Sequence, residues 1–202
     1  MLTLYHAAPS RSSTILWLMH ELGEPYEIKL IDLKKNEQKA PAYLKGSPAG
    51  KVPAISDNGV IVTESPAIAV YLCDKYPKAG LAPGISAPER GAYLKWMFFS
   101  TGCLEPAFMD AHMKRESPAM AAGWPPLPLV LELLSEALKA NAYLTGAKFT
   151  AADLIIGAFL RYSILIFKAI PERPEYMAYL ERLMARPAFK AAAAEDEKLA
   201  GG

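Results

Sequence analysis

The segment GKVPAISDNGVIVTES, residues 50 to 65, holds two short apolar runs separated by the sequence DNG at residues 57 to 59. Asn-Gly between apolar runs is a strong short-range signal for a β-hairpin turn. The segment therefore predicts two neighbouring antiparallel strands, VPAIS and VIVTE. A helix is expected directly after them over SPAIAVYLCDKYP, with Ser65 as its N-cap and Pro66 at its first position.

A β-α-β pattern precedes this hairpin. LTLYH is a β-prone run, and AAPSRSS after it offers several N-caps for a helix. Apolar residues then recur at helical spacing up to Gly23, which is placed to end the helix in a left-handed conformation. YEIKLIDL is the second strand, and a crossover helix of this kind joins parallel strands. Residues 1 to 76 are thus expected to form an α/β domain with a mixed sheet.

A stretch rich in Pro and Gly, PKAGLAPGISAP at residues 77 to 88, is expected to be a linker. The hairpin signals stop there, and residues 89 to 202 are expected to form an all-helical domain. Helices are predicted at 89 to 115, with a possible bend near Gly102 and Pro106, and at 127 to 140, 151 to 168 and 174 to 185. The third begins with a variant capping box, Thr150 and Asp153. The final run KAAAAEDEKLAGG is expected to fray.

The composition narrows the range of functions. Lys and Arg number 22 against 21 Asp and Glu, and no basic block appears, so nucleic acid is not an expected partner. The N-terminus lacks a signal-peptide pattern, and the most apolar run is broken by Arg161 and Lys168, so a membrane is not expected either. Cys73 and Cys103 form no C-x-x-C pair, which favours buried structural thiols in a reducing compartment. We therefore expect a cytoplasmic protein.

Two neighbouring pairs in the opening segment have alternative interpretations. Pro53 cannot donate to a sheet ladder, so it belongs at an edge, a strand start or a bulge. A cis Val52-Pro53 bond would leave the main chain of Val52 free to pair with an extended peptide, whereas a trans proline would simply open a strand. Glu64 and Ser65 either cap the helix, or hold the ammonium and carboxylate of an α-amino acid end.

Together, LTLYHAAPSRSS, GKVPAI, TESPAIAVYL and FTAADL resemble the cytosolic glutathione S-transferases, in particular bacterial members with a serine-type site. The resemblance covers essentially the whole chain. It implies a thioredoxin-like N-terminal domain with a mixed four-stranded sheet, followed by an all-helical C-terminal domain. It further implies a homodimer that binds glutathione as co-substrate in the first domain and uses no metal.

The resemblance also implies roles for residues of the opening segment. The Val52-Pro53 bond would be cis, and the main chain of Val52 would pair with the cysteinyl part of glutathione. Glu64 and Ser65 would hold the γ-glutamyl end. The glycyl carboxylate would meet Lys39, or alternatively Lys51 or Gln38, although a lysine is often just a solvated surface charge.

The glutathione thiol has to ionise before it can react, because the thiolate is the nucleophile. A free thiol has a pKa of about 8.5, and lowering it by about two pH units requires about 2.7 kcal/mol of preferential stabilisation of the anion. One hydroxyl donor to a charged acceptor contributes about 1.5 to 3 kcal/mol, and the positive end of the first helix adds to it. A hydroxyl beside the thiol can therefore supply the stabilisation.

Four hydroxyls are candidates for this donor. Alignment of SRSSTILWLMHELG with the serine-type pattern puts Ser10 in the catalytic place, with Thr14 where the family has an arginine. Ser12 is the second choice. Ser13 is a further candidate that also fits a purely structural place in the first helical turn. Tyr5 corresponds to the tyrosine that other members of the family use.

The resemblance places the electrophile in a cleft walled by the first long helix of the C-terminal half. Phe108 and His112 are the candidates there, although aromatic residues on that helix also suit the core. The expected function is conjugation of the glutathione thiolate to small hydrophobic electrophiles, as in detoxification. The alternatives are a glutathione-dependent peroxidase or disulfide reductase, and a non-catalytic module that binds glutathione or another ligand.

Overall fold

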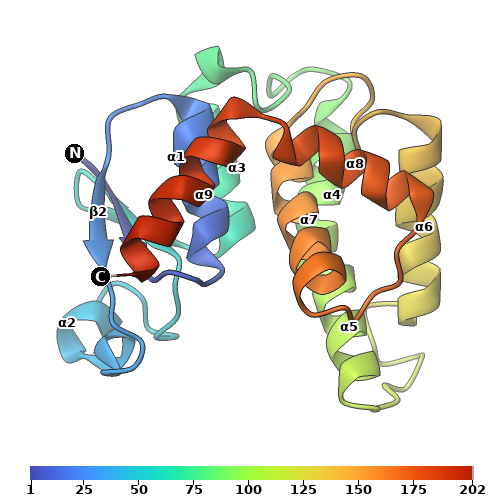
Figure 1. Cartoon of the computed structure of the whole chain (residues 1–202), viewed down its shortest axis with the longest axis horizontal. Helices are drawn as coiled ribbons and strands as arrows, with labels where there is room; N and C mark the ends of the chain where they lie inside the picture. The colour runs from blue at the N-terminus through green and yellow to red at the C-terminus, as the bar shows by residue number, and fades with distance from the viewer. Residues whose placement is uncertain (202) are drawn as a thin grey trace. The chain divides into compact units, whose positions relative to one another are not determined.

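The computed structural model describes residues 1–201. The chain forms two compact units (Figure 1). Unit 1 combines Met1–Leu81 with the segment from Ala185 onward, and unit 2 is Ala82–Met184. In the described part of the chain, no helix is both long and apolar enough to span a bilayer.

The sheet of unit 1 has four strands, in the order β2-β1-β3-β4. They are β1 (Leu2–His6), β2 (Glu27–Leu30), β3 (Ala54–Asp57) and β4 (Val60–Thr63). β1 runs parallel to β2 and antiparallel to β3, and β3 runs antiparallel to β4. This mixed sheet confirms the prediction and gives unit 1 its thioredoxin-like fold. The hairpin turn is the predicted one, with positive φ at Asn58 and Gly59.

The helices of unit 1 complete its core. They are α1 (Ser12–Leu22), the short α2 (Pro41–Leu44), α3 (Ser65–Lys75) and α9 (Pro187–Ala200). α1 packs against β1 and α3. It ends, as predicted, at Gly23, whose φ of 69° is left-handed and whose N–H bonds to the carbonyl of Met19. Several apolar side chains of this core are completely buried: Leu4, Ile15, Leu16, Leu18, Ile55, Ile68 and Leu72.

The hairpin is tied to α3 by a buried carboxylate. Asp57, at the end of β3, accepts a hydrogen bond of 2.8 Å from the hydroxyl of Tyr71 and another from the ammonium of Lys75. The hydrogen bond from Lys75, followed by that from Tyr71, lowers the pKa of the Asp57 carboxyl. The predicted hairpin turn therefore also anchors α3.

The C-terminal segment differs from its prediction. It does not fray but forms α9, which lies along α1 (Figure 1). Arg186 makes two hydrogen bonds, of 2.6 and 2.7 Å, to the carboxylate of Glu21, and the ring of Phe189 meets that of Trp17 edge to face at 5.1 Å. The composition of the segment suggested fraying, because the partners that hold α9 stand far away in the sequence.

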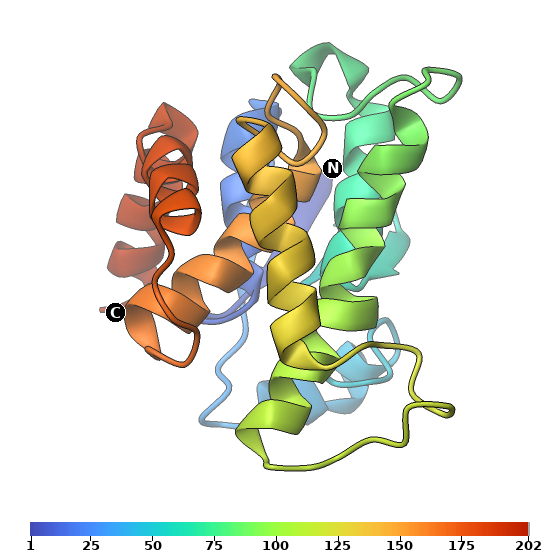
Figure 2. The ribbon, with the colours of Figure 1, turned by 90° about the vertical axis from the view of Figure 1, so that its right-hand side faces the viewer.

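Unit 2 is helical, as predicted. Its helices, coloured from green to orange in Figure 2, are α4 (Arg90–Phe99), α5 (Glu105–His112), α6 (Leu127–Ala140), α7 (Ala151–Arg161) and α8 (Pro174–Met184). α7 packs against α4 and α8, and α6 packs against α8. A π-helical turn, Ser100–Leu104, joins α4 to α5 where a bend was expected, and a second one, Tyr162–Ile166, follows α7.

The start of α7 carries the predicted capping box. Thr150 and Asp153 exchange both capping hydrogen bonds. Asp153 is fully buried and also accepts hydrogen bonds from the N–H of Leu144 (2.8 Å) and the hydroxyl of Tyr179 (3.0 Å). Burial raises the pKa of this carboxyl, and the hydrogen bonds partly oppose that shift. The capping box therefore also links α7 to α8.

Close packing of α7 on α8 requires a glycine. A Cβ atom on Gly157 would lie 2.1 Å from Cδ1 of Leu183, so Gly157→Ala should lower the free energy of unfolding by about 1–3 kcal/mol. Gly91 of α4 is the matched control because a Cβ atom there would meet nothing within 4 Å. Gly91→Ala should be neutral or stabilise by up to about 1 kcal/mol. Urea unfolding of both variants checks this, and equal effects would contradict it.

Asp57 should also give the chain a pH-dependent stability. Because its pKa is lowered in the folded state, its contribution is complete above the ordinary Asp pKa of about 3.9. That contribution is lost as the pH falls through the lower folded value. Asp57→Asn should therefore reduce the acid-side slope of unfolding free energy against pH. Parallel curves for the variant and the wild type would show that Lys75 and Tyr71 add nothing to stability through this carboxylate.

Candidate functional site

Three strand ends meet at one end of the sheet of unit 1. Tyr5 of β1 pairs with Ala54 of β3, and Ala54 pairs with Thr63 of β4. The loop after β1, the Val52-Pro53 step before β3 and Glu64 after β4 therefore leave the sheet at the same end. The register thus brings together three of the segments that the sequence analysis singled out.

The Val52-Pro53 peptide bond is cis, as the resemblance implied, and so is Ala8-Pro9. Pro53 is buried and Val52 is half-buried. Among residues 1–201, no hydrogen bond to the main chain of Val52 is found. A main-chain donor and acceptor next to a strand can pair with an extended peptide.

The turn into α3 is strained. Glu64 has φ 66° and ψ 118°, a conformation that residues with a Cβ atom rarely adopt. Glu64, and not Ser65 as expected, is the N-cap residue, and its side chain makes no capping hydrogen bond. Glu64 is exposed and Ser65 is partly exposed at the helix start. Strain of this kind gathers at functional sites.

The candidates for the glycyl carboxylate lie around Gly50. A Cβ atom on Gly50, whose φ is 60°, would come within 2.8 Å of Nζ of Lys39 and 2.9 Å of the carbonyl of Gln38. Lys39 and Lys51 are exposed. Oε1 of Gln38 is buried, and no described residue hydrogen-bonds to it. All three candidates therefore belong to one small region, in which Gln38 carries an unsatisfied acceptor.

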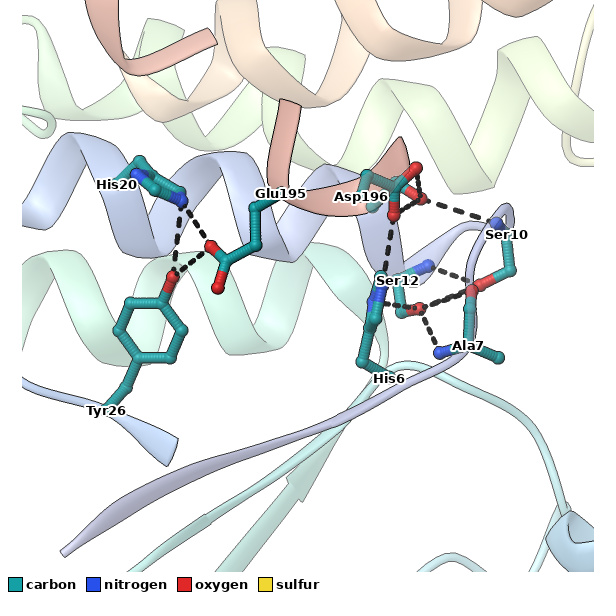
Figure 3. Close-up of polar contacts among 9 residues, drawn as sticks. His6, Ala7, Ser10, Ser12, His20, Tyr26, Glu195 and Asp196 are labelled. Carbon is teal, nitrogen blue, oxygen red and sulfur yellow. Dashed lines mark hydrogen bonds and ion pairs between the residues drawn. The ribbon is translucent and has the colours of Figure 1, made fainter. Parts of the chain in front are cut away.

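The serine loop, residues 7 to 13, comprises the connection after β1 and the first two residues of α1 (Figure 3). Oγ of Ser12 lies 2.7 Å from Oγ of Ser10 and 2.8 Å from Nδ1 of His6, and it accepts the N–H of Ala7 at 3.0 Å. Ser10 is half-exposed, whereas Ser12 and His6 are 0% exposed. Ser10 is therefore the hydroxyl that a ligand can reach, and Ser12 supports it from below.

The two other hydroxyl candidates point elsewhere. Ser13 donates to the carboxylate of Asp196 at 2.9 Å. Tyr5 alternates with His6 along β1, so its ring faces the opposite side of the sheet, where it meets Tyr43 edge to face at 5.6 Å. A cavity of about 600 Å³ lies on that side, between the sheet and α2, and its lining includes neither Ser10 nor Glu64.

Phe108 and His112 stand one turn apart on α5 in unit 2. Their rings stack with centroids 6.0 Å apart, and Phe108 also meets Phe159 of α7 edge to face at 5.4 Å. His112 is exposed and Phe108 is half-buried. The pair therefore forms an aromatic surface on unit 2.

The two cysteines lie outside the serine loop. Cys73 is buried in α3. Cys103 is half-buried in the π-helical turn of unit 2, and burial raises the pKa of its thiol, which makes it a weaker nucleophile. Among residues 1–201, no three His, Cys, Asp or Glu side chains gather where they could hold a metal ion.

Sequence reasoning missed His6 and Asp196. Nε2 of His6 lies 3.0 Å from Oδ1 of Asp196 in α9, although the pair does not meet the geometry of a hydrogen bond (Figure 3). A histidine directly before a serine-rich loop was a visible signal. Asp196 offered none, because its position in the sequence does not reveal that α9 returns to β1.

Two family models match the chain. The model described as "Glutathione S-transferase, N-terminal domain" matches residues 1–74, and "Glutathione S-transferase, C-terminal domain" matches residues 96–187. Glutathione S-transferase 3 of Schizosaccharomyces pombe is 33% identical over 171 residues, which cover 76% of this chain and 70% of that protein. Glutathione S-transferase GstA of Escherichia coli O157:H7 is 27% identical over 175 residues, 84% of this chain and 86% of that one.

Solved structures agree with the sequence relatives. The glutathione transferase of Methylococcus capsulatus has a TM-score of 0.81 and 28% identity, covering 98% of this chain and 100% of that chain. A sphingomonad glutathione S-transferase complexed with glutathione has a TM-score of 0.80 and 26% identity, covering 96% and 98%. With both halves of the family matched in sequence and the fold matched over nearly its whole length, the chain belongs to the glutathione S-transferases, a family of transferases.

Proposed function

We propose that this chain is a serine-type glutathione transferase, which adds the glutathione thiolate to small hydrophobic electrophiles in detoxification. The observation that carries the proposal is the hydroxyl of Ser10, a partly exposed residue, which lies 2.7 Å from the hydroxyl of Ser12 at the start of α1. The segment that carries Ser10 leaves the sheet at the same end as the segments that carry Val52 and Glu64. One ligand with a peptide main chain, a charged end and a thiol can meet all three.

Glutathione fits these groups in one orientation. The unpaired main chain of Val52 would pair with the cysteinyl residue, and Glu64 with the α-ammonium of the γ-glutamyl end. Ser65 and the start of α3 would receive the α-carboxylate of that end. Lys39, with Gln38 and Lys51 beside it, would meet the glycyl carboxylate. The sphingomonad relative, whose structure was solved in complex with glutathione, supports this choice of ligand.

The reaction needs only the bound thiol and its ionisation. Ser10 would donate a hydrogen bond to the thiolate, and the positive end of α1 would add to the stabilisation. The electron pair of the thiolate then forms the S–C bond, and the electrophile either expels a leaving group or takes up a proton. No metal is required by this chemistry.

The remaining parts of the proposal follow the family. Residues 1 to 76 would bind glutathione, residues 77 to 88 would act as a linker, and the helical part that begins at residue 89 would bind the electrophile. Phe108 and His112 would contribute an aromatic surface to that second site. We also propose that the protein is a cytoplasmic homodimer, which sedimentation analysis would test.

Ser10→Ala should raise the pKa of the bound glutathione thiol by about one to two pH units, because a hydrogen bond to a charged group contributes about 1.5–3 kcal/mol. kcat/KM at neutral pH should fall about 10- to 100-fold with it. A titration of the thiolate ultraviolet absorbance in the complex measures the pKa. Ser56→Ala, on β3, is the control and should change neither quantity. An unchanged thiol pKa in Ser10→Ala would remove Ser10 from the catalytic role.

Substrate comparison should separate the proposed reaction from its alternatives. Turnover should be faster with an aryl halide than with an organic hydroperoxide, because the proposed reaction joins the thiolate to a carbon atom. Steady-state rates with both substrates check this. The reverse order would indicate a peroxidase, and retention on immobilised glutathione without turnover would indicate a binding module.

A further inference from the structure

A continuous chain of polar contacts runs from Ser10 to α9 (Figure 3). Oγ of Ser10 lies 2.7 Å from Oγ of Ser12, which lies 2.8 Å from Nδ1 of His6. Nε2 of the same ring lies 3.0 Å from Oδ1 of Asp196, whose side chain is 17% exposed. The two inner members, Ser12 and His6, are 0% exposed, so water does not interrupt the chain.

The hydroxyl of Ser12 has few ways to satisfy these contacts. A hydroxyl group can donate one hydrogen bond and accept two. The N–H of Ala7 occupies one acceptor position. The hydroxyl proton of Ser12 and its second acceptor position are therefore shared between His6 and Ser10. The carbonyl of Ala7, at 3.2 Å, is a weaker acceptor for the same proton. The protonation of His6 decides the division.

When Nδ1 of His6 carries no proton, Ser12 donates to it. Ser12 then accepts the hydroxyl proton of Ser10, which points inward. When Nδ1 carries a proton, the ring donates to Ser12 and fills its second acceptor position. Ser10 then receives the Ser12 proton, in addition to the Ser12 N–H at 3.0 Å, and its own proton turns outward to the ligand.

We propose that His6 receives, through Ser12 and Ser10, the proton that the glutathione thiol loses, and that Asp196 stabilises the resulting imidazolium. This inference rests on the proposed function. The S–H bond breaks and its electron pair stays on sulfur. The thiol proton moves to Ser10, the Ser10 proton to Ser12 and the Ser12 proton to Nδ1 of His6, so that charge and atoms balance.

The thiolate left behind accepts a hydrogen bond from the outward hydroxyl of Ser10. One event thus ionises the thiol and creates the donor that stabilises it. His6 and Asp196 act only through the serines and are positioning residues. The order Asp, His and Ser is that of a hydrolase triad, but Ser12 is completely buried and has no access to a substrate.

The groups around the ring suit this role. Ser12 faces it from α1 and Asp196 faces it from α9, while the hydroxyl of Ser13 holds the carboxylate in place at 2.9 and 3.0 Å. The main chain of His6 is fixed by the N–H of Ile31, at 2.8 Å. These contacts fix the ring between a hydroxyl on one side and a carboxylate on the other.

Asp196→Asn tests the proposal through the sign of its effect. The proton transfer from the thiol to His6 through Ser10 and Ser12, called the relay below, predicts that the pKa of the bound thiol rises by about one pH unit. At a pH below the thiol pKa of both proteins, this is a tenfold loss of thiolate. Direct electrostatics predicts the opposite, because removal of a negative charge stabilises a thiolate. The measurement is a titration of thiolate absorbance in the full-length protein saturated with glutathione.

Glu195→Gln is the matched control. Glu195 precedes Asp196 on α9 and also contacts a histidine, His20, at 2.7 Å, with the hydroxyl of Tyr26 donating to it at 2.9 Å. Glu195→Gln removes the same charge and disturbs the same helix, but it should leave the thiol pKa unchanged. Urea unfolding of both variants shows whether α9 is weakened equally. Equal pKa shifts in the two variants would overturn the relay.

The double variant Ser10→Ala with Asp196→Asn shows whether Asp196 acts through Ser10. Its thiol pKa should equal that of Ser10→Ala alone. A further rise in the double variant, or no rise in Asp196→Asn, would overturn the relay and leave Ser10 as donor. No effect of Ser10→Ala would overturn the proposed function itself, and the relay with it.

Proton counting gives a second readout that does not depend on a variant. Calorimetric titration with glutathione, in buffers of different ionisation enthalpy, counts the protons released on binding. At a pH where thiolate absorbance appears, the relay predicts about no release beyond that seen with S-methylglutathione, because the proton stays on His6. Release of about one proton per thiolate formed would show that the thiol proton goes to solvent and would overturn the proposal.

Discussion

The hydrogen-bond register of β1, β3 and β4 is the constraint on which the site depends. Tyr5 opposite Ala54, and Ala54 opposite Thr63, bring the serine loop, the Val52-Pro53 step and Glu64 out at one end of the sheet. A slip of one residue would turn every side chain of a strand to the other face. His6 would then leave the α1 side of the sheet, and the contact chain through Ser12 could not form. The buried Asp57, which ties the hairpin to α3, helps to hold this register.

α9 adds a second, independent constraint on the same loop. It is anchored on α1 at its start by Arg186 and Phe189, and it presents two consecutive carboxylates further along. Glu195 contacts His20, and Asp196 contacts His6. Burial, followed by the hydrogen bond to Glu195, raises the pKa of Tyr26. The first unit is thus closed by a helix that comes from the far end of the sequence, and the chemistry proposed for the serine loop depends on that closure.

The sequence best predicted those features that depend on interactions between residues close together in the chain. The DNG turn, the helix stop at Gly23 and the capping box of Thr150 and Asp153 need only local interactions, and each was found where expected. The capping box failed to show that Asp153 also binds Tyr179, and the cap of α3 fell on Glu64 instead of Ser65. α9 and the His6 contact were missed because their partners are more than 150 residues apart and no local pattern connects them.

The backbone conformation of Glu64 lowers the stability of the fold at a residue that is proposed to bind the ligand. A side chain at φ 66° costs the folded state about 1–3 kcal/mol, and glycine would remove that cost. Glycine would also remove the carboxylate beside the start of α3, which is proposed to hold the ammonium of the γ-glutamyl end. Selection for thermal stability alone would therefore favour glycine at this position. Selection for the proposed ligand binding would keep glutamate, although the residue is strained there.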